Sequence, residues 1–116
     1  MLNYHPLNEL IQALKTKVYK NAKYLGWLRK QKCYSCPARA DITASHIFRG
    51  YHGLKNHDWG AVPMCGPCHW EYEYHKEWFV KRWHLPTAED AEKYWQKYLS
   101  ETGEVDDRTP EQKKSA

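Results

Sequence analysis

The chain has 116 residues, enough for one domain with at most a short arm and a tail. Charged residues make up 28% of it, the mean hydropathy is −0.93, and no run of about 18 apolar residues occurs, so the sequence excludes a membrane-spanning helix. Because the first residues also lack the charged and apolar regions of a secretion signal, we expect a cytoplasmic protein whose cysteines stay reduced.

The first predicted element is an amphipathic helix over residues 7–30. Its apolar residues recur at helical spacing, and its lysines fall mainly off that apolar stripe. The net charge of +4 is concentrated here, because residues 1–32 carry many basic side chains and one acidic side chain, Glu9. A basic arm suggests a polyanionic partner such as a nucleic acid, and a solvated helix face is an equally good interpretation.

The rest of the chain predicts two strands followed by two helices. The first strand covers 42–48 and the second covers 59–64. Residues 49–58 between them form a loop with Gly50, Gly53, Asn56 and Asp58. A helix is expected from Cys68 to about Trp83, and Pro86 prevents it from continuing further. Thr87 then begins a last helix, with Asp90 three residues later as a capping box. Most aromatic residues should form the core, and Tyr51 in the loop is a candidate for stacking on nucleic-acid bases.

Four cysteines form two Cys-x-x-Cys motifs, Cys33 with Cys36 and Cys65 with Cys68. Each motif can turn two thiolates toward one ion, and two motifs supply the tetrahedral four-sulfur shell that zinc favours. The sequence therefore predicts a structural Zn²⁺. Two other interpretations stay open: Cys-Gly-Pro-Cys is typical of thioredoxin-type redox sites, and Cys-x-x-Cys-His matches haem attachment. The first normally needs a βαβ context and the second needs export, and the sequence shows neither.

Histidines and carboxylates gather around this predicted hairpin. His46 ends the first strand, Asp58 ends the loop, and His69 begins the helix, with Glu73 four residues further on the same helix face. Such a set fits metal-assisted phosphodiester hydrolysis, in which a histidine activates water and a divalent ion stabilises charge on the phosphate. His5, His52 and His84 are expected to be ordinary surface or core residues, and His57 and His75 are undecided.

The segment from Cys33 to His75 resembles the HNH nucleases, also called His-Me finger or ββα-metal nucleases. The residues that carry the resemblance are His46-Ile47, Gly50, Gly53, Lys55, Asp58, Pro63 and Cys65-x-x-Cys68-His69. The pattern is similar to small phage and prophage HNH proteins, including the recombination-enhancement (Ref-like) group. The resemblance implies an α+β fold and does not cover the basic N-terminal helix. The expected parts of the whole chain are a basic amphipathic helical arm (1–31), a zinc-stapled HNH core (32–85), a C-terminal helix (86–100) and a disordered tail (101–116).

The resemblance also implies roles for individual residues. His46 matches the general base and His69 matches a ligand of the catalytic ion, expected to be Mg²⁺ or Mn²⁺. Asp58 matches the acidic residue of this subgroup and is expected to help hold that ion, with Glu73 or His75 as further candidates. The four cysteines match the structural zinc of those members that have one.

Two positions depart from the family pattern. Many HNH sites have Asp or His directly before the base, where this chain has Ser45. The middle Asn of the His-Asn-His motif is replaced by Gly60, and Asn56 is the nearest candidate for its role. A catalytically weak zinc-containing adaptor for nucleic acid or protein is therefore the alternative function.

The sequence thus predicts a metal-dependent DNA endonuclease, with RNA left open as a substrate. Its basic side chains would bind backbone phosphates without reading sequence; the candidates are Lys15, Lys20, Lys23, Arg29, Arg49 and Lys55. A phage-encoded protein of this kind would act in the host cytosol, with a recombination or packaging protein as a candidate partner. A redox protein that uses Cys65 and Cys68 is a third hypothesis.

Overall fold

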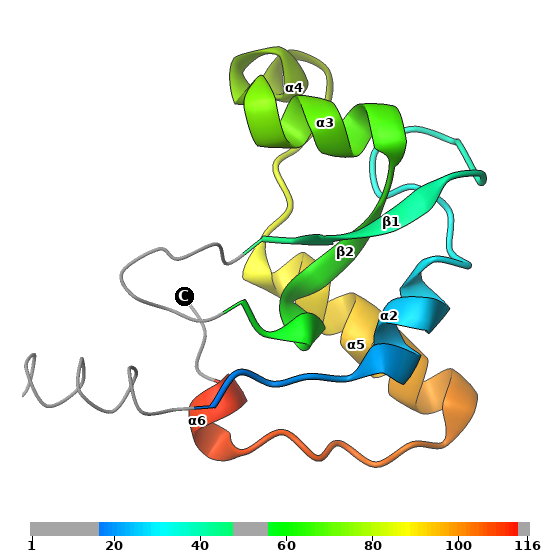
Figure 1. Ribbon diagram of the computed structural model, residues 1–116, viewed down its shortest axis with the longest axis vertical. Helices are drawn as coiled ribbons and strands as arrows, with labels where there is room; N and C mark the ends of the chain where they lie inside the picture. The colour runs from blue at the N-terminus through cyan, green and yellow to red at the C-terminus, as the bar shows by residue number, and fades with distance from the viewer. Residues whose placement is uncertain (1–16, 48–55, 114–116) are drawn as a thin grey trace, which may run out of the picture.

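The computed structural model describes residues 17–47 and 56–113, which form an α+β fold with a two-stranded antiparallel sheet and several helices (Figure 1). In chain order the elements are α2 (Ala22–Leu28), β1 (Ile42–His46), the 3-10 helix η2 (Asp58–Gly60), β2 (Ala61–Cys65), α3 (Gly66–Tyr74), α4 (Lys76–Arg82), α5 (Ala88–Thr102) and α6 (Pro110–Lys113). The α+β class predicted from the sequence is confirmed. Within the described residues, no helix has the length and apolar character needed to cross a membrane.

The single helix predicted over residues 7–30 is confirmed for α2 and wrong for residues 17–21. Those residues are not helical, and α2 begins after Asn21, whose backbone is extended. The Asn21 side chain caps the helix by accepting a hydrogen bond from the Tyr24 N–H (3.0 Å). Residues 7–16 lie outside the described part of the chain.

Tertiary hydrogen bonds explain why the segment before α2 is extended. The Tyr19 N–H donates to Nδ1 of buried His57 (2.9 Å), and the Tyr19 carbonyl accepts from the Asp58 N–H (2.9 Å). The Gln112 side chain donates to the Lys17 carbonyl (2.9 Å). These backbone groups are committed to partners far along the chain, so they cannot form a helical ladder.

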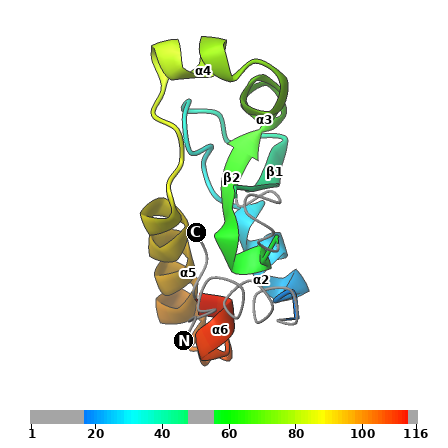
Figure 2. The same ribbon diagram turned by 90° about the vertical axis from the view of Figure 1, so that its left-hand side faces the viewer.

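The sheet pairs β1 with β2 so that Ile42 lies opposite Cys65 and His46 lies opposite Ala61. Every residue of β2 is buried, because α5 and α2 pack against one end of the sheet and α3 packs at the other (Figures 1 and 2). Pro63 is tolerated within the strand, and its carbonyl accepts a hydrogen bond from the Tyr34 N–H (2.7 Å). The hairpin therefore brings the end of β1 close to η2 and the start of β1 close to α3.

The helix predicted from Cys68 to about Trp83 is broken into α3 and α4. The break is at His75, whose backbone leaves the helical region (φ −142°, ψ 60°). Its N–H still donates to the Glu71 carbonyl, and its own carbonyl accepts from the N–H groups of Trp78 and Phe79. His75 thus ends one helix and begins the next.

The last helix, α5, is confirmed with its predicted capping box, since Thr87 and Asp90 exchange side chain–backbone hydrogen bonds. It runs two residues past the predicted end and stops at Gly103, whose positive φ of 73° suits a residue without a Cβ. The buried face of α5, formed by Ala91, Trp95 and Tyr98, packs on Tyr19 and Tyr24, which precede the sheet.

The tail predicted to be disordered from residue 101 is instead packed on the domain as far as residue 113. We call residues 103–113 the C-terminal strap. Its Arg108 side chain is only 3% exposed and bonds Glu92 (2.7 and 3.0 Å) and Asp106 (2.9 and 2.8 Å), while the guanidinium lies 4.8 Å from the Trp59 ring. The Trp59 indole N–H donates to the Gln112 carbonyl (2.8 Å). Charge pairing and aromatic contacts order a segment that its polar composition alone would leave free.

Candidate metal centre and histidine site

The four cysteines converge on one point, although the two motifs lie far apart in the sequence. Cys33 and Cys36 lie on the turn before β1, Cys65 ends β2 and Cys68 lies in the first turn of α3. Their sulfur atoms all lie within 4.8 Å of one another, and the Cys36 and Cys65 sulfurs are 3.6 Å apart. Tetrahedral Zn–S bonds of about 2.3 Å place sulfurs about 3.8 Å apart, so the tetrad has the size that a zinc ion needs.

The surroundings of the tetrad also suit a metal. All four cysteines are free of disulfides, and Cys33, Cys65 and Cys68 are buried. Burial acts to raise the pKa of Cys33, but the backbone N–H groups of Cys65, Cys36 and Ser35 outweigh burial and lower it. Burial raises the pKa of the Cys68 thiol. A metal cation binds thiolates, so an ion held by the four sulfurs would replace the thiol protons.

His46 and Asp58 are brought into contact. The Nε2 atom of His46, at the end of β1, lies 2.9 Å from Oδ1 of Asp58 in η2. The other carboxylate oxygen of Asp58 accepts a hydrogen bond from the Asn21 N–H (2.7 Å), and only 5% of the Asp58 side chain is exposed. Both oxygens of Asp58 are thus engaged by the protein, and the carboxylate is placed to orient the imidazole of His46.

His69 belongs to a second pair. Its Nδ1 lies 2.7 Å from the Thr43 hydroxyl, and its Nε2 lies 3.3 Å from a carboxylate oxygen of Glu73, one helical turn along α3. The Thr43 hydroxyl donates its proton to the Met64 carbonyl (2.8 Å), so it accepts the proton of His69 Nδ1. With that proton on Nδ1, a metal-free Nε2 without a second proton would turn its lone pair toward the carboxylate. Two acceptors this close need either a proton or a metal cation between them.

The structure does not bring Asp58 and His69 together around one ion. Thr43, which contacts His69, and His46, which contacts Asp58, are three residues apart in β1. Their Cα atoms are therefore about 10 Å apart along the strand. Ser45 shares the face of Thr43 and is fully buried, and its hydroxyl has no hydrogen-bond partner among the described residues. The ligand set expected from the sequence is thus divided between two pairs.

His75 and the other predicted histidines lie elsewhere. The His75 ring stacks on Trp78 (3.8 Å between centroids, 7° between planes), and its Nδ1 lies 3.5 Å from Glu77 rather than near Glu73. His57 is buried and binds the Tyr19 backbone, and His84 is exposed as expected. Asn56 is exposed, and Tyr51 lies outside the described residues.

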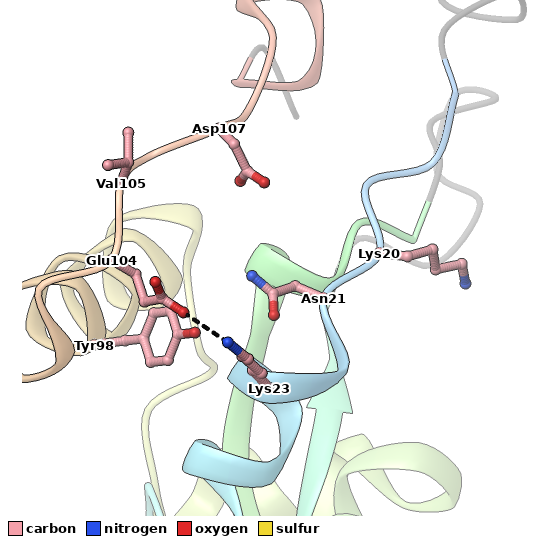
Figure 3. A pocket seen from close by; sticks show the side chains of 7 residues that line it. All are labelled: Lys20, Asn21, Lys23, Tyr98, Glu104, Val105 and Asp107. Carbon is pink, nitrogen blue, oxygen red and sulfur yellow. Dashed lines mark hydrogen bonds and ion pairs between the residues drawn. The ribbon is translucent and has the colours of Figure 1, made fainter.

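The predicted phosphate-binding residues are only partly described, since Lys15, Arg49 and Lys55 lie outside the described residues. Lys20 and Arg29 are exposed, whereas Lys23 forms an ion pair with Glu104 (3.3 Å). Figure 3 shows this pair across an open cavity of about 280 Å³ between the extended segment, α5 and the strap. Asp107 also lines the cavity, so acidic groups of the strap offset the basic arm there.

Sequence reasoning missed the residues that fix the two histidine pairs. Thr43 sets the tautomer of His69, and the backbone of Tyr19 and Asn21 holds η2 and Asp58. These contacts join residues 26 to 39 positions apart. No spacing motif spans such distances, and Thr43 carries no chemistry that would single it out in a strand.

The comparisons with known proteins give one match. A family model described as a protein of unknown function (DUF968) matches residues 3–85, which is more than half of the chain. No curated protein and no solved structure gives a significant match. The matched region contains the cysteine tetrad and both histidine–carboxylate pairs, whereas α5 and the strap follow it.

Proposed function

The chain belongs to the DUF968 family of proteins of unknown function, and we propose that it is a metal-dependent endonuclease of the HNH type that hydrolyses DNA phosphodiester bonds. The observation that carries this proposal is the contact between His46 and buried Asp58 at the end of β1. The β1–β2–α3 arrangement, with His46 on the first strand and His69 on the helix, agrees with the resemblance in the sequence.

His46 is the proposed general base. If its Nε2 donates a proton to Asp58, its Nδ1 carries the lone pair that can accept a proton from water. The Asp58 carboxylate would keep the ring in this tautomer and stabilise the imidazolium that forms, as a buried carboxylate does beside a catalytic histidine. The side chain of His46 is 28% exposed, so water and a phosphodiester can reach it. In this proposal Asp58 is a positioning residue and not an ion ligand.

His69 and Glu73 are the proposed ligands of the catalytic ion. Their facing acceptor atoms supply the imidazole and carboxylate that Mg²⁺ or Mn²⁺ accepts, and the side chains are partly exposed (27% and 19%). A divalent ion bound there would stabilise the negative charge that develops on the phosphate and the leaving oxygen. The cysteine tetrad is the proposed site of a separate, structural Zn²⁺ that holds the hairpin to α3.

The reaction itself is a hydrolysis. A water molecule loses a proton to His46, its oxygen forms the new bond to phosphorus, and the bond from phosphorus to the 3′-oxygen breaks. Exposed basic side chains around α2, including Lys20 and Arg29, would bind the flanking phosphates.

One observation favours a second candidate, a zinc-containing adaptor that binds nucleic acid or protein without cutting. The two histidine pairs start from β1 residues three positions apart, Thr43 and His46, and Ser45, which stands where many HNH sites have an ion ligand, is buried. An adaptor would keep the cysteine tetrad and the basic surface and would need no catalytic ion.

Nicking of supercoiled plasmid by protein with one zinc per chain separates the two candidates. We expect nicking with Mg²⁺ or Mn²⁺, none without added divalent ion, and a loss of at least about 100-fold in His46→Ala. His84→Ala is the matched control, because His84 is an exposed histidine outside both pairs. Nicking by His46→Ala at the wild-type rate would refute the assignment of the base. DNA binding without nicking under every ion would favour the adaptor.

A further inference from the structure

The α3–α4 hairpin carries an exposed group of aromatic rings. Trp70 is 51% exposed, Tyr74 71% and Trp78 47%, although large aromatic side chains normally lie in the core. We call these three residues and His75 the aromatic cluster. The hairpin forms the end of the domain remote from α6 (Figures 1 and 2), so the cluster is accessible from outside.

The rings are held together in a defined arrangement. Trp70 lies 6.3 Å from Tyr74, 4.7 Å from His75 and 6.4 Å from Trp78, measured between ring centroids, and His75 stacks on Trp78 at 3.8 Å. The break between α3 and α4 creates this arrangement, because the His75 carbonyl binds the Trp78 N–H and turns α4 back toward Trp70. A preorganised aromatic surface loses little conformational entropy when a flat ligand stacks on it.

The aromatic cluster lies beside the proposed ion ligands. On α3 the two proposed ligands, His69 and Glu73, are four residues apart. Each is directly followed by an aromatic residue, Trp70 after His69 and Tyr74 after Glu73. Residues four apart share a helix face, and neighbours in sequence lie about 100° apart around the axis. A phosphodiester bound at His69 and Glu73 would have its adjacent bases within reach of the rings.

The charge of α4 favours a nucleic acid over an apolar partner. This helix carries exposed Lys76 and Lys81 and one acidic residue, Glu77, while its Arg82 pairs with Glu71 of α3. Aromatic rings interleaved with basic side chains are the usual composition of surfaces that bind single strands, where the rings stack on bases and the cations contact phosphates. Bases of a duplex are already stacked on each other, so only unpaired bases offer a free face to the cluster.

We propose that the aromatic cluster of Trp70, Tyr74, His75 and Trp78 is a stacking platform for unpaired bases of single-stranded DNA, next to the phosphodiester site. The proposal extends the nuclease function above and rests on it for the position of the phosphate. It assigns the substrate class: DNA with a single-stranded segment at the site of cleavage, such as a flap, gap or displaced strand, rather than continuous duplex.

Binding of oligo(dT) to the zinc-loaded protein tests this proposal without cleavage. Fluorescence anisotropy would be measured for a labelled oligo(dT) and for a hairpin duplex of the same length, with no Mg²⁺ or Mn²⁺ present. Trp70→Leu and Trp78→Leu keep an apolar side chain but remove the aromatic face, and Trp70→Phe keeps an aromatic ring. Each stacked base contributes about 1–3 kcal/mol, so we expect each Leu variant to bind oligo(dT) roughly 5- to 150-fold more weakly.

We expect Trp70→Phe to stay within about 3-fold of wild type and duplex binding to be nearly unchanged in all three variants. Equal weakening for oligo(dT) and duplex, wild-type affinity of both Leu variants for oligo(dT), or association of the protein with itself through this face would overturn the platform. Quenching of tryptophan fluorescence in the unsubstituted protein by oligo(dT) is a second readout that needs no variant.

The two proposals fail in different ways. If His46→Ala and wild type both bind oligo(dT) through the cluster but neither cuts DNA, the proposed nuclease function is wrong and the proposed stacking platform is supported. If the Leu variants bind and cut single-stranded DNA as wild type does, the proposed nuclease function is supported and the proposed stacking platform is wrong.

Discussion

The two ends of the domain are stabilised in different ways. At one end, β1, β2 and α3 are joined through four cysteine sulfurs that lie within 4.8 Å of one another. At the other end, α2, α5 and the C-terminal strap are joined by packed aromatic rings and by Arg108, which bonds Glu92 and Asp106 between Trp59 and Trp95. The four sulfurs of the first end could share one metal ion, whereas the second end depends on many contacts. The stability of the two ends should therefore respond differently to substitution.

The largest loss of stability should come from substitution in the cysteine tetrad. Cys68→Ser should prevent stoichiometric zinc binding and cooperative unfolding, because the binding free energy of a structural zinc, about 10–16 kcal/mol, equals or exceeds the stability of a small domain. Zinc content and thermal unfolding would be measured together. Ser35→Ala, a change in the same turn that leaves all four sulfurs, should keep both near wild type. A stable Cys68→Ser protein without zinc would contradict the comparison.

An intermediate effect is expected at the Arg108 end. Arg108→Met should lower the free energy of unfolding by about 3 kcal/mol, because it leaves two carboxylates without their buried partner, while zinc stays bound. The Arg108 guanidinium lowers the pKa of Asp106 to about 2, which agrees with a strong ion pair. Urea denaturation would measure the loss. Arg82→Met is the control: that side chain is 60% exposed and pairs with Glu71, so its loss should cost less than about 1 kcal/mol. Equal losses of unfolding free energy in the two variants would show that the burial of Arg108 adds nothing to the stability of the protein.

The smallest effect concerns a tyrosine at the same end. Burial raises the pKa of the Tyr24 phenol well above its ordinary value, and its hydroxyl has no hydrogen-bond partner among the described residues. Tyr24→Phe should therefore stabilise the protein by about 1 kcal/mol. Tyr34→Phe should destabilise it by a similar amount, because the Tyr34 hydroxyl donates to Asp90 (2.7 Å).

The same pKa shift gives a pH dependence with a definite sign. Tyr24 is neutral when protonated and its pKa is raised on folding, so its contribution is complete below the ordinary tyrosine pKa near 10 and is lost as the pH rises above that value. Thermal unfolding between pH 8 and pH 11 should show a smaller alkaline loss of stability for Tyr24→Phe than for wild type. A larger loss in the variant would contradict this account.

The comparison also explains which parts of the molecule could be predicted from sequence. The cysteine tetrad depends on two short motifs, and the α5 cap depends on residues three apart, so local spacing was sufficient for both. The extended segment at Tyr19 and the packed strap at Arg108 depend on partners that lie 16 to 95 residues away. Helical periodicity and polar composition suggested a helix and a free tail there, and long-range contacts overrode both.

The candidate site follows the same rule. His46, Asp58, His69 and Glu73 were identified by residue type and by the family resemblance, but their division into two pairs depends on the register of β1 and β2. The sequence did not contain the information that Asp58 has both oxygens engaged by the protein, because one donor is the Asn21 backbone.

The most direct test of this account is the dependence of DNA cleavage on Mg²⁺ concentration in Asp58→Asn and Glu73→Gln. If Asp58 orients the base and Glu73 holds the ion, Asp58→Asn should lower the maximal rate about 100-fold at an unchanged Mg²⁺ midpoint. Glu73→Gln should shift the midpoint to higher Mg²⁺ and recover much of its rate at saturation. A shifted midpoint in Asp58→Asn and an unshifted one in Glu73→Gln would contradict the two-pair site, and absence of cleavage by wild type would contradict the nuclease itself.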